Sequence, residues 1–333
     1  MDRASIERAP KAELHVHLEG AWPWETIRRF HPDGRRLPER PPWLTESARL
    51  DFDAFVRIFR EHVLPSFASI AALEAGGRDL VAWLDRCGVR YVEFTDSGDF
   101  MELRGIRFED GMPALHRAVI DEGARRGIAV RMFAGLKRNY SPDLSARWME
   151  RWLSLGKDLL HGIDLMGYER LGPAAPHKKA YDMARQAGLR LKAHAGEHGG
   201  PDQVWEAMDV LGATHIGHGA QAIEDPALVR ELARRGVVLN MCPTSNVILG
   251  VCRTMEEHPI RALFDAGVRV TVSTDDPLIF GNDLNGEYLA LHRSLGFTPG
   301  ELRRIARTGF EEAMVTESER TRLLSQVDAA FTG

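Results

Sequence analysis

Several features that mark specialised classes of protein are scarce in this sequence. The 333 residues include only three cysteines, Cys87, Cys242 and Cys252, and no C-x-x-C pair. A disulfide framework is therefore excluded, and we expect buried or incidental thiols in a reducing cytoplasm. No apolar run approaches the length of a membrane span, and the polar first residues, MDRASIERAP, do not resemble a signal peptide.

Positive charge is not in excess either. The formal net charge is −5 and no basic block occurs, so we expect no binding to nucleic acid or to a membrane surface. The length and the ordinary apolar content suffice for a full hydrophobic core, and we predict a single domain over residues 1–333. We expect a cytoplasmic monomer or homodimer whose partner is a small-molecule substrate.

The sequence does contain a regular alternation of two kinds of segment. Short apolar runs rich in β-branched residues, each followed by a polar or glycine-rich turn, are typical of strands buried in a parallel sheet. Amphipathic segments that end at glycine lie between them and predict helices. This alternation predicts a (β/α)8 barrel of the TIM type. The predicted strands are 13–18, 90–95, 129–136, 162–167, 189–197, 214–219, 236–243 and 268–277, and the predicted helices are 113–127, 177–188, 201–212, 225–236 and 258–267.

Two regions interrupt the alternation. Residues 21–89 are too long for one helix, and we predict a helical insertion over the C-terminal face of the barrel, where barrel enzymes place their active sites. Within it, the segment 51–63 predicts a helix with Phe55 and Phe59 on one side, and core packing is the simpler interpretation of each aromatic taken alone. Residues 283–333 predict additional C-terminal helices that pack outside the barrel.

Unexpected polar residues lie at the C-terminal ends of the predicted strands. They are His15, His17, Glu19, His194, Glu197, His215, His218, Asp275 and Asp276. Because strand side chains alternate between faces, His15 and His17 point the same way, and inside a barrel their ring nitrogens need polar partners. A metal ion is the simplest such partner.

Four of these residues offer a suitable set of metal ligands. His15, His17, His194 and Asp275 combine neutral imidazole with carboxylate, which suits one Zn²⁺ ion, while the same groups also accept Fe²⁺, Co²⁺ and Mn²⁺. A single H-x-H pair is weak evidence. The joint occurrence of all four residues at one end of one barrel is much more specific.

The neighbouring polar residues predict catalytic roles. A zinc ion lowers the pKa of a bound water molecule; Asp275 can accept a hydrogen bond from that water, and His218 can orient it or take its proton. Glu197 can donate a proton to the substrate, and the alternative is an ordinary carboxylate at a helix N-terminus. Asp276 is predicted to contact the substrate, and His215 to support the structure.

Six motifs then resemble the adenosine deaminase family of the amidohydrolase superfamily. They are PKAELHVHLEG (10–20), GIDLMGYE (162–169), HAGE (194–197), HIGHG (215–219), CPTSN (242–246) and STDDPLIF (273–280). The resemblance implies a barrel with one zinc ion and the hydrolytic removal of the 6-amino group of a purine. The predicted fourth strand lacks the lysine of many two-metal relatives, which supports a single metal ion.

The resemblance also implies roles for individual residues. The four candidate ligands match the metal ligands of the family. Glu197 matches the acid that protonates purine N1, and His218 matches the residue that deprotonates or orients the attacking water. Asp276 matches the contact to N7, and the Gly167 N–H matches the contact to N3.

The match is looser where the family would hold a sugar. Phe55 and Phe59 resemble the apolar lid over the purine only in their general position. Glu19 stands where adenosine-specific members carry an aspartate that meets the ribose 5′ end, and Tyr168 stands where GDE is usual. Residues 91–100 lack the E-x-R of the family. The longer side chain of Glu19 indicates a different group at this end of the substrate, or none, and we treat Glu19 and Tyr168 as candidate substrate contacts.

The substrate prediction rests on these departures. The motif STDDPLIF (273–280) keeps the TDDP of nucleoside enzymes, whereas adenine-specific members carry SDDP. We predict deamination of adenosine or of a 5′-modified adenosine such as aminodeoxyfutalosine. Deamination of free adenine is one alternative, against which the TDDP motif argues. A catalytically silent purine-binding protein is the other.

Overall fold

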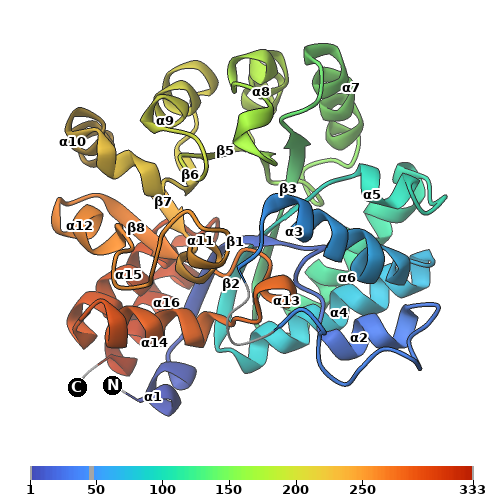
Figure 1. Ribbon diagram of the computed structural model, residues 1–333, viewed down its shortest axis with the longest axis horizontal. Coiled ribbons are helices and arrows are strands. Elements are labelled where there is room, and N and C mark those ends of the chain that lie inside the picture. Colours follow the sequence, from blue (N-terminus) through green and yellow to red (C-terminus); the bar gives the residue numbers. More distant parts are fainter. Residues whose placement is uncertain (1, 45–48, 332–333) are drawn as a thin grey trace.

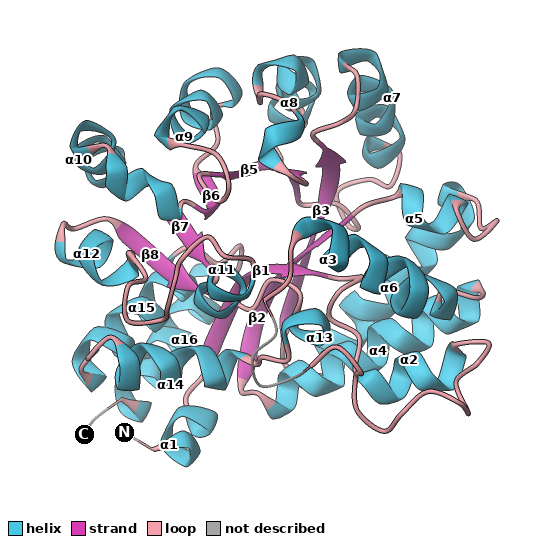
Figure 2. Cartoon of the chain, in the orientation of Figure 1, coloured by secondary structure: helices cyan, strands magenta, loops and turns pink. Residues whose placement is uncertain are grey.

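Eight parallel strands form a nearly closed barrel in the computed structural model, which describes residues 2–44 and 49–331 (Figure 1, Figure 2). Each strand pairs with the next one along the chain. A bridge between Val16 and Asp275 brings the first and last strands together, and the His17 N–H donates to the Asp275 carbonyl at 2.8 Å. The strands are β1 (Lys11–His17), β2 (Val89–Asp96), β3 (Ala129–Lys137), β4 (Gly162–Met166), β5 (Arg190–Ala195), β6 (His215–His218), β7 (Val238–Met241) and β8 (Arg269–Val272). The predicted (β/α)8 barrel is confirmed.

A helix follows each strand and surrounds the barrel (Figure 2). In chain order these helices are α4 (Ile70–Arg86), α6 (Phe108–Arg126), α7 (Pro142–Leu153), α8 (Lys178–Gln186), α9 (Pro201–Glu206), which continues as η5 (Ala207–Leu211), α10 (Pro226–Arg235), α12 (Ile260–Asp265) and α15 (Pro299–Glu311). Within the described residues, no helix is long and apolar enough to cross a membrane.

Shorter or additional helices complete the chain. They are α1 (Arg3–Arg8), α2 (Trp24–Phe30), α3 (Phe52–Ile58), η1 (Phe59–Val63), η2 (Leu64–Ser66), α5 (Asp99–Glu102), η3 (Glu169–Leu171), η4 (Ala175–His177), η6 (Ala220–Glu224), α11 (Pro243–Ile248), α13 (Pro277–Phe280), α14 (Leu284–Ser294) and α16 (Glu317–Ala330). Helices α3, α11 and α13 lie across the mouth of the barrel in Figure 1. We call residues 52–66 the lid segment.

The predicted insertion and the predicted C-terminal helices are both present, and the structure shows which helix of each region belongs to the ring around the barrel. Within 21–89, helix α4 packs against α6 and β2 and is the ordinary crossover between the first two strands, so only the preceding part is inserted. Within 283–333, helix α15 packs against β8 and β1 and completes the ring of helices. Only α14 and α16 are additional there. Sequence pattern does not distinguish a crossover helix from an added one, because both are amphipathic.

Two helices differ from the prediction. The predicted helix 113–127 begins earlier, at Phe108, so Pro113 lies inside it and lacks an N–H for the bond to the preceding turn. Phe108 is fully buried, and this packing holds the first turn despite the proline. Helix α7 was not predicted, although Ser141 caps it by accepting the Leu144 N–H at 3.2 Å and proline follows the cap.

Candidate active site

Three imidazoles and one carboxylate converge at the C-terminal end of the barrel. His15 and His17 belong to β1, His194 belongs to β5, and Asp275 follows β8. One ligand atom from each residue lies within 4.8 Å of those of the others. All are buried except His17, which is partly exposed. The structure thus brings together all four predicted metal ligands.

The distances within this cluster fit a shared metal ion. The Nε2 atoms of His17 and His194 are 3.1 Å apart, and Asp275 Oδ1 lies 3.2 Å from His15 Nε2 and 3.3 Å from His17 Nε2. Four ligands placed tetrahedrally about 2.0 Å from a zinc ion would lie roughly 3.3 Å from one another. Neither ring nitrogen of the buried His15 has a hydrogen-bond partner within the described residues. The donor set therefore fits a bound cation.

Polar neighbours orient two of the ligands. Asp164 Oδ1 accepts a hydrogen bond from His194 Nδ1 at 3.0 Å, which leaves the His194 Nε2 lone pair for the cluster, and Thr95 donates to Asp164 Oδ2 at 3.0 Å. Ser245 donates to Asp275 Oδ2 at 2.6 Å, which leaves Oδ1 free. Such partners set the orientation and basicity of metal ligands. These partners were not predicted, although the carboxylate of Asp164 in a buried apolar strand is a signal for one of them.

Backbone strain marks the two strand ends that carry His218 and Asp275. Their φ angles are 62° and 65°, and among the described residues they are the only non-glycine residues with positive φ. This conformation costs about 1–3 kcal/mol and persists only where the surrounding structure enforces it. The strained residues thus coincide with two of the predicted catalytic residues.

A cavity of about 370 Å³ opens beside the cluster, a size typical of sites for small molecules. Its apolar wall comes from the lid segment and from Phe280 of α13, and Phe55 and Phe280 face each other with ring centroids 6.1 Å apart. Every residue predicted to contact the substrate or to act in catalysis lines this cavity: Glu19, Phe55, Phe59, Gly167, Tyr168, Glu197, His218, Asp275 and Asp276. Of the predicted ligands, His15 lies beneath the cavity and not on its surface.

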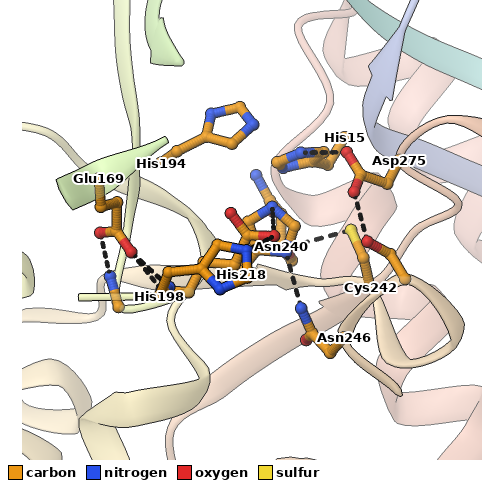
Figure 3. A network of polar contacts seen from close by, with 12 residues as sticks. His15, Glu169, His194, His198, His218, Asn240, Cys242, Asn246 and Asp275 are labelled. Carbon is orange, nitrogen blue, oxygen red and sulfur yellow. Dashed lines mark hydrogen bonds and ion pairs between the residues drawn. The ribbon is translucent and has the colours of Figure 1, made fainter. Parts of the chain in front are cut away.

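Glu197 lies buried in the loop after β5. Burial and the negative charges of Asp275 and Glu169 raise the pKa of its carboxyl well above the usual range, which favours the protonated form. The Glu169 carboxylate holds the loop, because it accepts hydrogen bonds from the N–H groups of residues 196–199 at distances of 2.7 or 2.8 Å (Figure 3). No role was predicted for Glu169, because its four partners lie on a loop that is distant in the sequence.

A chain of hydrogen bonds shows which nitrogen of His218 carries the proton. The Ile260 N–H donates to His258 Nδ1 at 3.2 Å, so neutral His258 carries its proton on Nε2 and donates it to Asn246 Oδ1 at 3.0 Å. The Asn246 amide nitrogen then donates to His218 Nδ1 at 3.1 Å (Figure 3). Neutral His218 therefore carries its proton on Nε2, which lies 3.8 Å from Glu197 Oε1. Burial lowers the pKa of His218 well below its usual value and favours this neutral form.

Asp276 lies against the turn that follows β1. Its carboxylate packs on Gly20, where a Cβ atom would fall 1.6 Å from Oδ1, so this approach requires glycine. Burial and the nearby charges of Asp275 and Glu19 raise the pKa of Asp276 well above its usual range. The raised pKa favours the protonated form of Asp276, which can donate a hydrogen bond into the cavity.

Glu19 forms part of the same wall. Its Oε1 accepts hydrogen bonds from the Ser97 N–H at 2.6 Å and from the Ser97 hydroxyl at 2.8 Å. Its Oε2 is buried and has no hydrogen-bond partner within the described residues. Burial and the charge of Asp96 raise the pKa of Glu19 to about 7. Ser97 was not predicted as a site residue, because its contact with Glu19 spans two neighbouring strands.

Tyr168 connects the loop after β4 to the lid segment. Its ring stacks on Phe52 with centroids 4.7 Å apart and an interplanar angle of 17°, and it meets His198 edge-on at 5.2 Å. The aromatic side chain at this position therefore packs on the lid in addition to lining the cavity.

Two further polar residues are His215, predicted to support the structure, and Cys242, predicted to be a buried or incidental thiol; their surroundings differ. His215 Nε2 lies 3.2 Å from the Glu312 carboxylate, away from the cavity, in agreement with a structural role. Cys242 is buried and free, as are the other two cysteines, but its sulfur lies within 4.8 Å of ligand atoms of His218 and Asp275. Because burial raises the pKa of the Cys242 thiol well above its usual range, the group stays protonated and is no thiolate ligand.

Comparison with known proteins identifies relatives over the whole barrel. The adenosine deaminase family model matches residues 10–330. The chain is 36 % identical over 319 residues to an adenine deaminase of Sinorhizobium medicae, covering 95 % of this chain and 97 % of that protein. It is 34 % identical over 331 residues to an adenine deaminase of Streptomyces coelicolor, covering 96 % and 95 % of the two chains.

Solved structures agree with this relationship. An adenine deaminase from Arthrobacter aurescens superimposes with a TM-score of 0.88 at 26 % identity, covering 98 % of this chain and 100 % of that one. An amidohydrolase from Burkholderia ambifaria with bound zinc shares the fold, with a TM-score of 0.88 at 24 % identity over 99 % and 92 % of the chains.

Metal-dependent hydrolases built on a barrel are the class that this fold and this ligand cluster define. The family match narrows that class. The chain belongs to the adenosine deaminase family and is a hydrolytic deaminase that acts on C–N bonds.

The predicted nucleoside substrate was wrong. Relatives that are 31–36 % identical over at least 95 % of this chain are named adenine deaminases, which favours the free base. The threonine of the motif that argued against adenine does not contact the cavity. Thr274 donates its N–H and hydroxyl to the Glu13 carboxylate at 3.2 and 3.0 Å and does not line the cavity. Threonine or serine at this position therefore says nothing about a sugar.

Proposed function

We propose that this enzyme hydrolyses adenine, as the free base, to hypoxanthine and ammonia. The observation that carries the proposal is the likeness to proteins named adenine deaminase over at least 95 % of the chain. A cavity with one apolar wall and a few buried polar groups supports a flat heterocycle as the substrate.

In this proposal His15, His17, His194 and Asp275 hold one zinc ion. Support comes from three ligand-atom distances of 3.1–3.3 Å, those of His17 to His194 and of Asp275 to His15 and His17, and from the thiolate-free donor set. When bound, the ion acts as a Lewis acid that makes hydroxide available near neutral pH. Metal analysis of the purified enzyme tests its identity, since the same ligands accept other divalent ions.

The side chains around the cavity orient the purine. Glu197 faces N1, the Gly167 N–H donates to N3, and Asp276 donates to N7. Phe55 and Phe59 of the lid segment cover the face of the ring and exclude water. Protonated Asp276 suits N7, because this nitrogen is an acceptor in adenine.

Glu197 supplies the proton that the reaction needs at the ring. Addition of water to C6 pushes an electron pair onto N1, and a proton donor at N1 stabilises the charge that develops there. Burial and the charges of Asp275 and Glu169 keep Glu197 protonated before the reaction. The C6–N6 bond then breaks, and the amino group leaves as ammonia.

His218 orients the attacking water in this proposal and is not its base. Its Nε2 carries a proton and donates a hydrogen bond to the attacking oxygen, whose own proton passes to Asp275. The hydrogen bond from Asn246 to His218 Nδ1 supports this choice between the two roles that the sequence left open. Asp275 can then pass the proton to the leaving amino group.

The decisive experiment compares substrates on one preparation. Ammonia release is measured with adenine, adenosine, 2′-deoxyadenosine and 5′-methylthioadenosine, together with metal content. We expect kcat/KM for adenine to exceed the nucleoside values by about 100-fold or more. Faster turnover of any nucleoside would overturn the proposal. The single domain 1–333, the cytoplasmic location and the monomer or homodimer state stay predictions.

A further inference from the structure

The order of groups around the cavity follows the order of nitrogens around a purine ring. In the proposed orientation, Glu197 after β5 meets N1, Gly167 after β4 meets N3, and Asp276 after β8 meets N7. On the ring, N9 lies between N3 and N7. On the barrel, the ends of β3, β2 and β1 lie between β4 and β8. The N9 position of the substrate therefore faces these three strand ends.

Glu19 presents a buried carboxyl group at this place, and the ionised form of this group is a hydrogen-bond acceptor. It is 4 % exposed, it lines the cavity, and its Oε2 has no partner within the described residues. The two hydrogen bonds from Ser97 hold Oε1 and so fix the position of the carboxyl group in the cavity wall. The other polar residues from these strand ends differ in kind. The Ser97 hydroxyl donates to Glu19 and His17 is a candidate metal ligand. Lys137 and Arg138 carry donors only, and Asn139 is exposed.

We propose that Glu19 Oε2 accepts the N9–H hydrogen bond of a free purine base and so selects the base against N9-substituted purines. This inference rests on the proposed function and names what that site recognises. A buried acceptor without a donor is costly, and the N9–H of adenine removes that cost. A nucleoside carries carbon at N9, so it brings no hydrogen and directs its sugar at the fixed carboxylate.

The test compares adenine with 9-methyladenine, in which a methyl group replaces the N9 hydrogen. In Glu19→Gln, the amide oxygen takes the two Ser97 donors, so the amide NH₂ faces the cavity and opposes the N9–H of adenine. We expect kcat/KM for adenine to fall by about 10- to 100-fold, and kcat/KM for 9-methyladenine to stay within about threefold. Glu19→Ala should raise kcat/KM for 9-methyladenine relative to adenine, because it removes both the acceptor and the obstruction.

Binding of products gives a second measurement that does not depend on the chemical step. The inhibition constant of hypoxanthine is compared with that of 9-methylhypoxanthine in the wild type and in Glu19→Gln. The wild type should prefer hypoxanthine by about 10- to 100-fold, and the variant should lose this preference. Glu61→Gln, an exposed change on the lid segment, is the control and should leave both ratios unaltered.

The outcomes separate this inference from the proposed function. A wild type that releases no ammonia from adenine overturns the proposed function. A different result is a wild type that deaminates adenine while Glu19→Gln loses kcat/KM equally for adenine and 9-methyladenine, or loses none for either. Either pattern in the variant overturns the role of Glu19 and leaves the proposed function intact. Melting curves of each variant identify a substitution that merely unfolds the protein. In that case the ratio of the two inhibition constants, measured on the folded fraction, decides whether Glu19 recognises N9–H.

Discussion

Replacing Glu169 by glutamine tests the electrostatics of the site most directly. The change keeps the size of the side chain but leaves one oxygen for four backbone N–H donors, which lie at distances of 2.7 or 2.8 Å. At least one N–H then faces an amide NH₂ group. Hydrogen bonds to a charged group contribute about 1.5–3 kcal/mol and an unpaired buried donor costs about 1–3 kcal/mol, so we expect the free energy of unfolding to fall by about 2–4 kcal/mol.

The same change has a thermal and a kinetic readout. At about 2.1 cal/mol/K per residue, the unfolding entropy of 333 residues is roughly 0.7 kcal/mol/K, so the melting temperature should fall by about 3–6 °C. The charge of Glu169 also contributes to the raised pKa of Glu197. Without that charge the pKa of Glu197 falls, the proton is lost at lower pH, and the basic limb of the kcat/KM profile for adenine should move to lower pH.

A matched control is available on the same face of the molecule. Glu206 also accepts two backbone N–H groups, those of Ala174 at 2.6 Å and Ala175 at 3.1 Å, but it does not line the cavity. Glu206→Gln should lower the melting temperature and leave the basic limb where it is. An unchanged basic limb in Glu169→Gln, or equal movement in both variants, would refute the electrostatic reasoning.

Three further changes address the proposed chemistry. Glu197→Gln should lower kcat for adenine by at least about 100-fold while metal content is retained, measured by ammonia release and metal analysis. Asp164→Asn should weaken metal affinity by about 10- to 100-fold in a chelator competition, because the partner of His194 Nδ1 is lost. Asn246→Asp should move the proton of His218 from Nε2 to Nδ1, since a carboxylate accepts where the amide donated; ¹⁵N spectra of labelled histidine report the tautomer.

Each of these changes has a contrary outcome. Normal turnover in a zinc-loaded Glu197→Gln enzyme would remove Glu197 from the mechanism. Unaltered metal retention in Asp164→Asn would show that His194 needs no partner. An unchanged His218 tautomer in Asn246→Asp would contradict the donor directions inferred along the chain from Ile260 through His258.

Much of the site was predictable because its residues are ordered along a simple repeating fold. In a parallel barrel the C-terminal ends of all strands meet at one face, so polar residues that follow different strands must lie together. That rule alone joined His15 and His17 to His194 and Asp275 across more than half of the chain. The same rule placed Glu197 in the cavity wall, although β5 ends two residues before it.

The prediction failed where the meaning of a residue depends on what surrounds it. Thr274 looked like a substrate signal, but its hydroxyl points to Glu13 along the barrel interior. Glu169 and Asn246 looked unremarkable, because their partners come from loops far away in the sequence. Helix α15 looked like an appendage, because only packing against β8 and β1 distinguishes it from its neighbours.

The sequence alone therefore predicted the barrel and the class of chemistry, both of which are confirmed, and it proposed a ligand set whose four members the fold brings together. Alternation and motif spacing can be read without knowledge of side-chain contacts. Tertiary structure decided the rest: the raised pKa of Glu197, the tautomer of His218, and the fixed carboxylate of Glu19 beside Ser97. Each of these properties depends on buried neighbours that come from separate strands and loops. Electrostatic and hydrogen-bond energies depend on the distances between such groups in space and not on their separation along the chain.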